Sequence, residues 1–363
     1  MSDDSIYYLG FSHFLGIGPV RIKLLLSEFK TAKNAYLATV AQLKKILGEK
    51  LAEEFVSFRS RFDLNKKLSE LTDKKIRVVC QADNDYPSSL KNMNDPPICL
   101  YIKGDWRSYS FDNQLCIAVV GTRKPTSYGI KIAKKFASAL AERGVIIVSG
   151  MALGIDTVAH RSALAEDGRT VAFLGSGVDI IYPLSNRSLY EQIVYKGGLV
   201  ISEFPPGMTV KPGLFIARNR LISGLAKGVF VVEGGERSGA LITARYAAEQ
   251  GRSVFAPPAP LDCEMSFAPN FLIKEGAKMV TSVDDILIEY NIAAAVGKVQ
   301  NNVKRSLSKE EAKLVEVLGK GVSRANEISL FLNLPIENVL KTVSSLELKG
   351  LLEKNSEGYY QLI

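Results

Sequence analysis

The sequence predicts an α/β protein with a doubly wound, mostly parallel sheet, preceded by a helical segment and followed by a small helical module. Between residues 115 and 258, short runs rich in Val and Ile alternate with segments of helical periodicity. The runs are apolar at consecutive positions, as strands covered by helices on both faces require. Regular alternation of strands and helices is typical of doubly wound sheets with right-handed crossovers.

The first seventy residues predict a set of short helices. Apolar residues recur at helical spacing from Ile22 to Phe29 and from Leu43 to Leu47, and Thr31 marks a further helix start. The segment LGIGPVRIK (residues 15–23) places glycines in a turn before a helix. It is either the hairpin of a helix-hairpin-helix unit, whose backbone N–H groups can face a phosphate, or an ordinary turn between helices. We assign residues 1–70 to a helical domain similar to SAM or helix-hairpin-helix domains.

The central domain is expected to span residues 71–290. Strands at 76–80 and 98–104 flank a connection dense in Pro, Asn and Asp. The alternating part follows this connection. Its expected strands are residues 115–121, 145–150, 170–177, 198–203, 228–235 and 253–258, and its expected helices are residues 128–143, 155–166, 186–196, 217–226 and 239–250.

The end of the chain predicts a linker and a third domain. Residues 291–306 are small, polar and basic without a clear period, which favours a linker. Residues 307–363 carry three helical patterns and then a turn at 355–358 between two short strands. This order predicts a winged helix-turn-helix domain.

Composition excludes several classes of protein. No apolar run approaches the roughly 18–20 residues of a membrane span, and the acidic start MSDDSIYYLG is unlike a signal peptide. The four cysteines, at positions 80, 99, 116 and 263, are too few and too scattered for a disulfide framework and form no CxxC pair for zinc. We therefore expect a cytoplasmic protein without membrane contact.

The net charge of +8 permits a polyanionic partner, and its distribution indicates where that partner binds. Residues 1–70 carry a net charge of +3, residues 71–306 carry +6, and residues 307–363 carry −1. Most of the positive excess therefore belongs to the α/β domain, whereas the winged-helix module carries none. We expect that module to bind duplex DNA weakly or not at all, because few phosphates could be neutralised, and to have a protein-interaction or regulatory role.

Candidate binding residues follow the strands, because ligands of open α/β sheets bind outside the carboxyl ends of the strands. Glycines there let backbone N–H groups approach a phosphate, cations neutralise it, and aromatic rings stack on bases. Cations interleaved with aromatics favour single-stranded nucleic acid. The candidates for DNA binding are Gly121, Thr122, Arg123, Lys124, Tyr128, Gly150, Gly154, Gly175, Gly177, Tyr182, Asn186, Arg187, Phe215, Arg218, Asn219, Arg220, Ser238 and Gly239, with Lys211 as a further cation of the rim.

Cofactor and catalytic signals are weak. Gly175-x-Gly177 lacks the third glycine of the dinucleotide fingerprint, and no GxxxxGK[ST] P-loop is present, so we expect no nucleotide cofactor. The histidines are His13 and His160, and His160 is interpreted as structural. Ser149, Ser176 and Ser238 have no evident histidine partner for a triad, and no residue set has metal-ligand spacing. Asp156, Asp179 and Glu203 either contact a base or ribose or order the arginines of the loops, and we favour the second reading.

Six motifs in the same order resemble the DNA-processing protein A family (DprA, also called Smf) over about residues 115–280. They are AVVGTRKPTSYG, SGMALGIDTVAH, FLGSGVDIIYPLSN, ISEFPPG, ARNRLISGLAKGVFVVEGGERSGALITARYAAEQGRSVFAPP and NFLIKEGA. The resemblance implies an extended Rossmann-like core without enzymatic activity. It also implies a homodimer that binds and protects incoming single-stranded DNA and loads RecA recombinase, in the presence of single-strand binding protein, during natural transformation.

The resemblance carries some residue roles to this chain. The arginine of the family's G-S/T-R loop, which contacts DNA, corresponds to Arg123, the basic residue after YPxxN to Arg187, and the R-N-R motif to Arg218 and Arg220. Three positions depart from the family pattern. Ile216 replaces a proline, APPAP (256–260) replaces V-P-G, and CEMSFAPN (263–270) replaces a glycine-rich loop.

An enzyme acting on a nucleotide is the alternative. Phosphoribohydrolases with a related fold have a PGGxGTxxE signature, and EGGERSGALIT (233–243) stands at a comparable strand end. Glu233 and Thr243 replace the first proline and the final glutamate of that signature.

Overall fold

The structure is a computed structural model that describes residues 4–292, 308–318, 324–332, 334–348, 352–354 and 359–362. The chain forms two compact units, Met1–Tyr290 and Asn291–Ile363. The expected bounds at residues 70 and 290 stay predictions; the first lies within the first unit and the second lies beside the division between the units. Most of the expected linker, residues 293–306, lies outside the described part of the chain.

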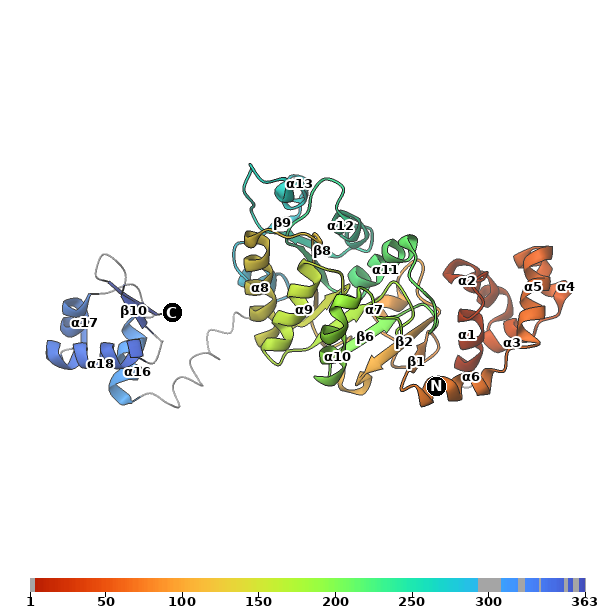
Figure 1. The fold of residues 1–363 in the computed structure, drawn as a ribbon, viewed down its shortest axis with the longest axis horizontal. Helices are drawn as coiled ribbons and strands as arrows, with labels where there is room; N and C mark the ends of the chain where they lie inside the picture. Colours follow the sequence, from red (N-terminus) through yellow and green to blue (C-terminus); the bar gives the residue numbers. More distant parts are fainter. Residues whose placement is uncertain are drawn as a thin grey trace. The chain divides into compact units, whose positions relative to one another are not determined.

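The first unit is built on a nine-stranded sheet with the strand order β1-β2-β6-β5-β4-β3-β7-β8-β9 (Figure 1). The strands from β6 through β5, β4, β3, β7 and β8 to β9 run parallel to one another. Strands β1 and β2 extend the sheet beyond β6 by antiparallel pairing. The mixed α/β fold and the mostly parallel sheet confirm the predicted fold class. The strands are β1 (Arg77–Cys80), β2 (Cys99–Gly104), β3 (Cys116–Val120), β4 (Ile146–Ser149), β5 (Thr170–Phe173), β6 (Leu199–Ser202), β7 (Gly228–Val231), β8 (Ser253–Ala256) and β9 (Lys278–Met279).

The central strands are Val- and Ile-rich because both of their faces are covered. Every residue of β3, β4, β5, β6 and β7 is buried. Helices α8, α9 and α10 pack along one another and on these strands, and α11 and α12 form a second packed pair (Figure 1). The helices are α8 (Ser127–Glu142), α9 (Ile155–Ala165), α10 (Arg187–Tyr195), α11 (Pro212–Leu225), α12 (Gly239–Glu249), α13 (Phe267–Lys274) and α14 (Asp284–Glu289), with a short α7 (Ser88–Lys91) before β2.

Helix α11 begins five residues earlier than the residue 217 that its apolar pattern predicts. Its first residue is Pro212. Proline is favoured at this position because its missing N–H would have no partner in the helix and its φ angle is already helical. The extra turn carries Phe215 and Ile216, which places both residues on a helix instead of a loop.

The N-terminal helices share a hydrophobic core with the sheet. Phe11 and Phe55 stack with ring centroids 5.1 Å apart, and the same buried cluster includes Tyr101 of β2. Thr31 caps a helix by accepting a hydrogen bond from the Asn34 N–H, which confirms the predicted helix start. The helices are α1 (Ser5–Ser12), α2 (Pro19–Phe29), α3 (Ala32–Leu37), α4 (Val40–Leu47), α5 (Glu49–Arg59) and α6 (Leu64–Asp73).

In the residues of the second unit that the structure describes, three helices and an antiparallel strand pair follow one another in the predicted order. Leu314, Ile328 and Val343 belong to its buried core. The predicted turn at 355–358 lies outside the described residues, and the winged-helix assignment stays a prediction. The elements are α16 (Lys309–Leu318), α17 (Ala325–Leu332), α18 (Ile336–Leu348), β10 (Leu352–Lys354) and β11 (Tyr360–Leu362). Across the described parts of both units, no helix combines the length and apolar character needed to cross a membrane.

Candidate nucleic-acid interface

A cavity of about 750 Å³ lies where the direction of the sheet's connections changes. Strands β4, β5 and β6 extend the sheet on one side of β3, and β7, β8 and β9 extend it on the other. The loops after β3 and β7 therefore leave the sheet side by side, and such a switch point forms a crevice for ligands. The cavity is lined by both loops, by α11, by the start of α12 and by Glu264 and Met265.

The loop after β3 is fixed by a buried carboxylate. The Glu233 side chain accepts hydrogen bonds from the Thr126 backbone N–H at 2.9 Å and from the Thr126 hydroxyl at 2.5 Å. The Thr122 N–H also donates to the Glu233 carbonyl at 2.8 Å. On the other side, Gly154 has a φ of +79°, and a Cβ there would lie 2.3 Å from the Thr122 carbonyl oxygen. These contacts hold the exposed Arg123 at the cavity rim.

A row of one cation and two aromatic rings leads away from the cavity. The Arg123 guanidinium carbon lies 5.7 Å from the centroid of the Phe215 ring. The Phe215 ring in turn lies 5.4 Å from the Tyr182 ring, with an interplanar angle of 43°. Gly175 makes room for Phe215, because a Cβ there would be 2.8 Å from Cδ1 of that ring. The structure therefore brings together three predicted binding residues, two from strand-end loops and Phe215 from α11.

Arg218 lines the cavity floor but is buried, with 3% of its surface exposed. Its guanidinium donates to the carbonyl oxygens of Gly150 and Phe173. A Cβ at Gly150 would be 2.4 Å from Nη1 of Arg218, so this glycine accommodates the arginine. Burial lowers the pKa of Arg218 to about 10, and Asp156 opposes that effect, so the side chain remains charged at neutral pH. The guanidinium of Arg218 and the Gly150 carbonyl are thus engaged inside the protein, whereas the sequence places both residues among the candidates for DNA contact.

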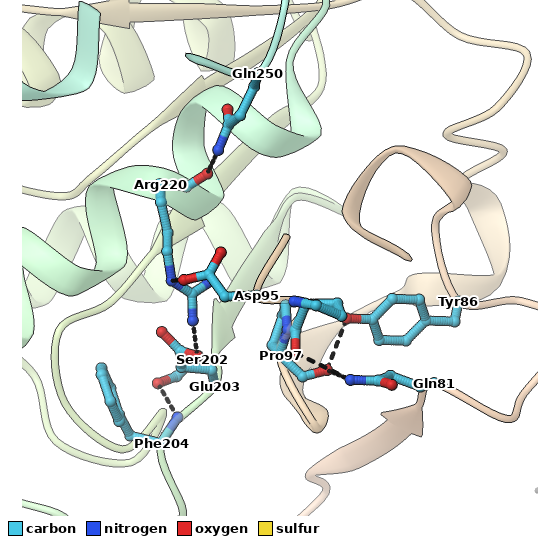
Figure 2. Close-up of polar contacts among 10 residues, drawn as sticks. Gln81, Tyr86, Asp95, Pro97, Ser202, Glu203, Phe204, Arg220 and Gln250 are labelled. Atoms are coloured by element: carbon cyan, nitrogen blue, oxygen red, sulfur yellow. Dashed lines mark hydrogen bonds and ion pairs between the residues drawn. The ribbon is translucent and has the colours of Figure 1, made fainter. Parts of the chain in front are cut away.

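Arg220 is also occupied by protein groups (Figure 2). Its Nη2 donates to Oε2 of Glu203 at 2.5 Å, and its Nε pairs with Oδ2 of Asp95 at 3.0 Å. Its backbone carbonyl accepts from the Gln250 side chain at 2.9 Å. Burial raises the pKa of the Glu203 carboxyl, while Arg220 opposes this rise. The guanidinium of Arg220 is thus paired inside the protein, whereas the sequence places this residue among the candidates for DNA contact.

Two of the three acidic residues interact with an arginine, and one of these interactions is a hydrogen-bonded ion pair. Glu203 pairs with Arg220. Asp156 interacts electrostatically with Arg218 and accepts from the Gly150 N–H at 3.2 Å. Asp179 instead accepts from the Gly207 N–H at 2.7 Å and orders a loop.

The other predicted residues differ in their side-chain contacts and in whether they line the cavity. Asn186 is buried and donates to the Met151 carbonyl and the Thr157 hydroxyl, both at 2.9 Å, so its side chain is committed to the fold. Tyr128 is half-buried and donates to the Pro258 carbonyl at 2.6 Å. Ser238 caps α12. Those that line the cavity are Gly121, Thr122, Arg123, Lys124, Phe215, Arg218, Asn219, Ser238 and Gly239, and those outside its lining include Gly177, Tyr182, Arg187, Lys211 and Arg220.

The structure adds residues that sequence reasoning missed. Arg237 is exposed and lines the cavity beside Glu236. It lies in the loop between β7 and α12, so the strand-end rule applied to that loop could have found it. Glu264 and Met265 come from the segment that departs from the family pattern, and Asp95 comes from an irregular connection with no local signal. The last three become visible only once the fold brings distant segments together.

The candidate catalytic residues have structural contacts. His160 is buried, its Nδ1 lies 2.7 Å from the Thr170 hydroxyl, and burial lowers its pKa to about 3. The Ser149 hydroxyl donates to the Val119 carbonyl, and the Ser176 hydroxyl to the Ile180 carbonyl. Among the residues that the structure describes, no group of three or more His, Cys, Asp or Glu could hold a metal ion.

A cationic and aromatic site at the switch point of an α/β sheet has the chemistry that nucleic-acid-binding proteins use. Comparison with known proteins specifies the family. The sequence model of the DNA recombination-mediator protein A family matches residues 77–291. This chain belongs to that family.

Relatives and solved structures agree with this assignment. Protein Smf of Escherichia coli is 34% identical over 338 residues, covering 91% of this chain and 89% of the relative. The crystal structure of DNA processing protein A from Streptococcus pneumoniae has a TM-score of 0.68 and 35% identity, covering 80% of this chain and 98% of that one. DNA processing protein A from Helicobacter pylori, described for its single-stranded DNA binding mode, has a TM-score of 0.53 and 30% identity, covering 60% of this chain and 95% of that one.

Proposed function

We propose that the cavity and the row formed by Arg123, Phe215 and Tyr182 bind single-stranded DNA. The row is the observation that carries this proposal, because it places a cation beside one aromatic ring and a second ring against the first, at the cavity rim. Unpaired bases offer their faces to aromatic rings, whereas the bases of a duplex are already stacked. The Helicobacter pylori relative, which binds single-stranded DNA, supports the same ligand class for this chain.

Different cations have different roles in this proposal. Arg123, Lys124 and Arg237 are exposed at the cavity and contact phosphates. Arg187 and Lys211, also exposed, extend the binding track beyond the cavity. The buried arginines act indirectly. Arg218 joins α11 to the ends of β4 and β5, and Arg220 joins α11 to Glu203 and Asp95, so both hold the helix that carries Phe215.

The biological role follows from the family. A recombination mediator of this kind protects incoming single-stranded DNA and loads RecA recombinase in the presence of single-strand binding protein during natural transformation, and we propose this role, in the cytoplasm, for this chain. We also propose a homodimer formed through the core domain. The exposed apolar side chains of Phe267, Phe271 and Met279 on α13 and β9 support such an association.

Stacking on Phe215 distinguishes this proposal from binding by charge alone. We expect wild-type protein to bind a 20-nucleotide oligothymidine more tightly than a duplex of the same length in fluorescence anisotropy titrations. Phe215→Ala should weaken oligothymidine binding by about 1–3 kcal/mol, the usual contribution of one stacked base. Tyr195→Ala removes a 91% exposed aromatic outside the site and should leave affinity unchanged. Equal losses in both variants, or a preference for duplex, would contradict the proposal.

The enzymatic alternative has a separate test. Wild-type protein is incubated with each nucleoside monophosphate, and release of free base is followed by chromatography. We expect no release. Base release that Arg123→Ala abolishes would assign the cavity to a phosphoribohydrolase instead.

A further inference from the structure

Cys80 and Cys99 face each other across the first two strands of the sheet. They are direct partners in the antiparallel register of β1 and β2. Their Sγ atoms lie 2.9 Å apart, and both cysteines are free thiols. The sequence contains no signal for this pair, because nineteen positions separate the two residues and pairing depends on the strand register. The structure therefore creates a dithiol that cysteine spacing alone does not predict.

The backbone geometry at this position is compatible with a disulfide. The Gln81 N–H donates to the Ile98 carbonyl, so the neighbouring residue pair is hydrogen-bonded. Hydrogen-bonded and non-hydrogen-bonded pairs alternate, and the Cys80 N–H donates to Asp83 instead of β2. Cys80 and Cys99 therefore form a non-hydrogen-bonded pair, in which Cα atoms lie about 4.5 Å apart. Disulfides span Cα separations of about 4.4–6.8 Å.

Access to the pair depends on movement of an edge strand. Both side chains are 0% exposed and belong to the core shared with the N-terminal helices. Burial raises the pKa of the Cys80 thiol well above its usual range, so the closed structure holds few thiolates. Strand β1 is the last strand at this edge of the sheet and pairs only with β2. Local opening of β1 exposes Cys80 first.

We propose that Cys80 and Cys99 form a reversible disulfide when β1 opens in the presence of a low-molecular-weight disulfide such as oxidised glutathione. The Cys80 thiolate attacks the small disulfide, forms a mixed disulfide and releases one small thiol. The Cys99 thiolate then attacks Sγ of Cys80, forms the Cys80–Cys99 bond and releases the second small thiol. Two protons pass from the protein thiols to the products, and the small disulfide accepts the two electrons.

The Cys80–Cys99 bond closes a covalent loop around residues 81–98. Within this segment, the Gln81 side chain donates to the Pro96 and Pro97 carbonyls, and the Tyr86 hydroxyl donates to the Pro97 carbonyl (Figure 2). Asp95, near its end, pairs with Arg220 of α11. Oxidation therefore links the two residues that flank this segment, and the segment supports α11 through Asp95. The bond also prevents β1 from separating from β2.

Mass spectrometry on the full-length protein tests the proposal. Wild-type protein and the matched control Cys116→Ala are incubated with oxidised glutathione in mild urea, in which hydrogen exchange confirms that β1 opens, and free thiols are then alkylated. We expect both proteins to yield one peptide pair linked through Cys80 and Cys99, with a mass about 2 Da, two hydrogen atoms, below the sum of the two reduced peptides. Reduction with dithiothreitol separates the pair into two peptides with free thiols, and amide exchange in residues 77–104 is slower in the oxidised form.

Cys80→Ala and Cys99→Ser should each retain a glutathione adduct on the remaining cysteine and form no internal bond. The wild-type result does not depend on these variants, so the proposal remains testable if either variant fails to fold. Recovery of wild-type protein with all four thiols alkylated, while β1 exchanges its amides, would overturn the proposal. A bond that involves Cys116 or Cys263 instead would overturn it as well.

Discussion

Arg123 and Arg220 are both arginines near strand ends, yet their environments give them opposite roles. Arg123 is exposed beside the Phe215 ring, where its charge is available to a phosphate. Arg220 is 7% exposed and contacts two carboxylates. Sequence position suggests a free cation in both cases, because a strand end reveals location but not burial. The acidic partners of Arg220 lie 125 and 17 positions away, and only the fold brings them together.

Replacing Arg220 should therefore affect stability more than replacing Arg123. Arg220→Ala leaves the buried Glu203 carboxylate without its cation, and breaking such a pair typically costs about 3–5 kcal/mol. Arg123→Ala is the matched control and should change the free energy of unfolding by less than about 0.5 kcal/mol. Urea denaturation followed by circular dichroism measures both. Similar stabilities for the two variants would show that the Arg220 network is not a support of the fold.

His160 predicts a pH dependence of stability. Its folded-state pKa is about 3, below the ordinary value of 6.5, because burial disfavours the charged ring. As pH falls below 6.5, the unfolded chain binds a proton that the folded protein does not, so this contribution to stability decreases down to about pH 3. Between pH 7 and pH 5 we expect His160 to account for a loss of about 2 kcal/mol.

The variant His160→Gln removes this titration. The difference between wild-type and variant unfolding free energies should shrink by that amount when urea denaturation is repeated at pH 5 instead of pH 7. A difference that is independent of pH would mean that the folded ring takes up its proton over the same pH range as the unfolded chain.

At the scale of elements, the sequence patterns predict the alternating helices and strands because each depends on local periodicity. Val- and Ile-rich runs identify β3 to β8, and Ser127–Glu142 lies within one residue of the expected helix. Local patterns do not predict the antiparallel pairing of β2 with β6, because these strands are about a hundred residues apart in the sequence. The shared core of the N-terminal helices and β2 is equally non-local, so local sequence patterns alone predict a boundary at residue 70.

The second unit should be dispensable for single-stranded DNA binding. Its helices α17 and α18 expose Glu327, Glu337 and Glu347 against Lys341, so this surface gains little from contact with phosphates. A chain ending at residue 290 contains the whole first unit. We expect this shortened chain to bind oligothymidine within about twofold of the full chain, and the two to bind duplex equally weakly, in anisotropy titrations at physiological salt. A large loss of duplex affinity on truncation would assign DNA binding to the second unit.

For the whole molecule, the charge distribution and the fold point to the same place. The net charge is +8, and residues 71–306 contribute +6 of it. Doubly wound topology brings the ends of β3 and β7 together, so Arg123, Lys124 and Arg237 meet at one cavity although more than one hundred positions separate the two loops. The buried Arg218 and Arg220 also add to the net charge, but they serve the fold. Total charge therefore overstates the number of cations available to DNA.

The most direct test is the salt dependence of oligothymidine binding. It compares wild-type protein with Arg123→Ala/Arg237→Ala, and with the control Lys50→Ala/Lys75→Ala, which removes two exposed cations outside the cavity lining. Each lost phosphate contact reduces the slope of log K against log salt by about 0.7. We predict that the arginine variant loses about 1.4 from the magnitude of this slope and at least about tenfold in affinity, while the lysine control retains both. Equal slopes and affinities for the two double variants would contradict the assignment of DNA binding to this cavity.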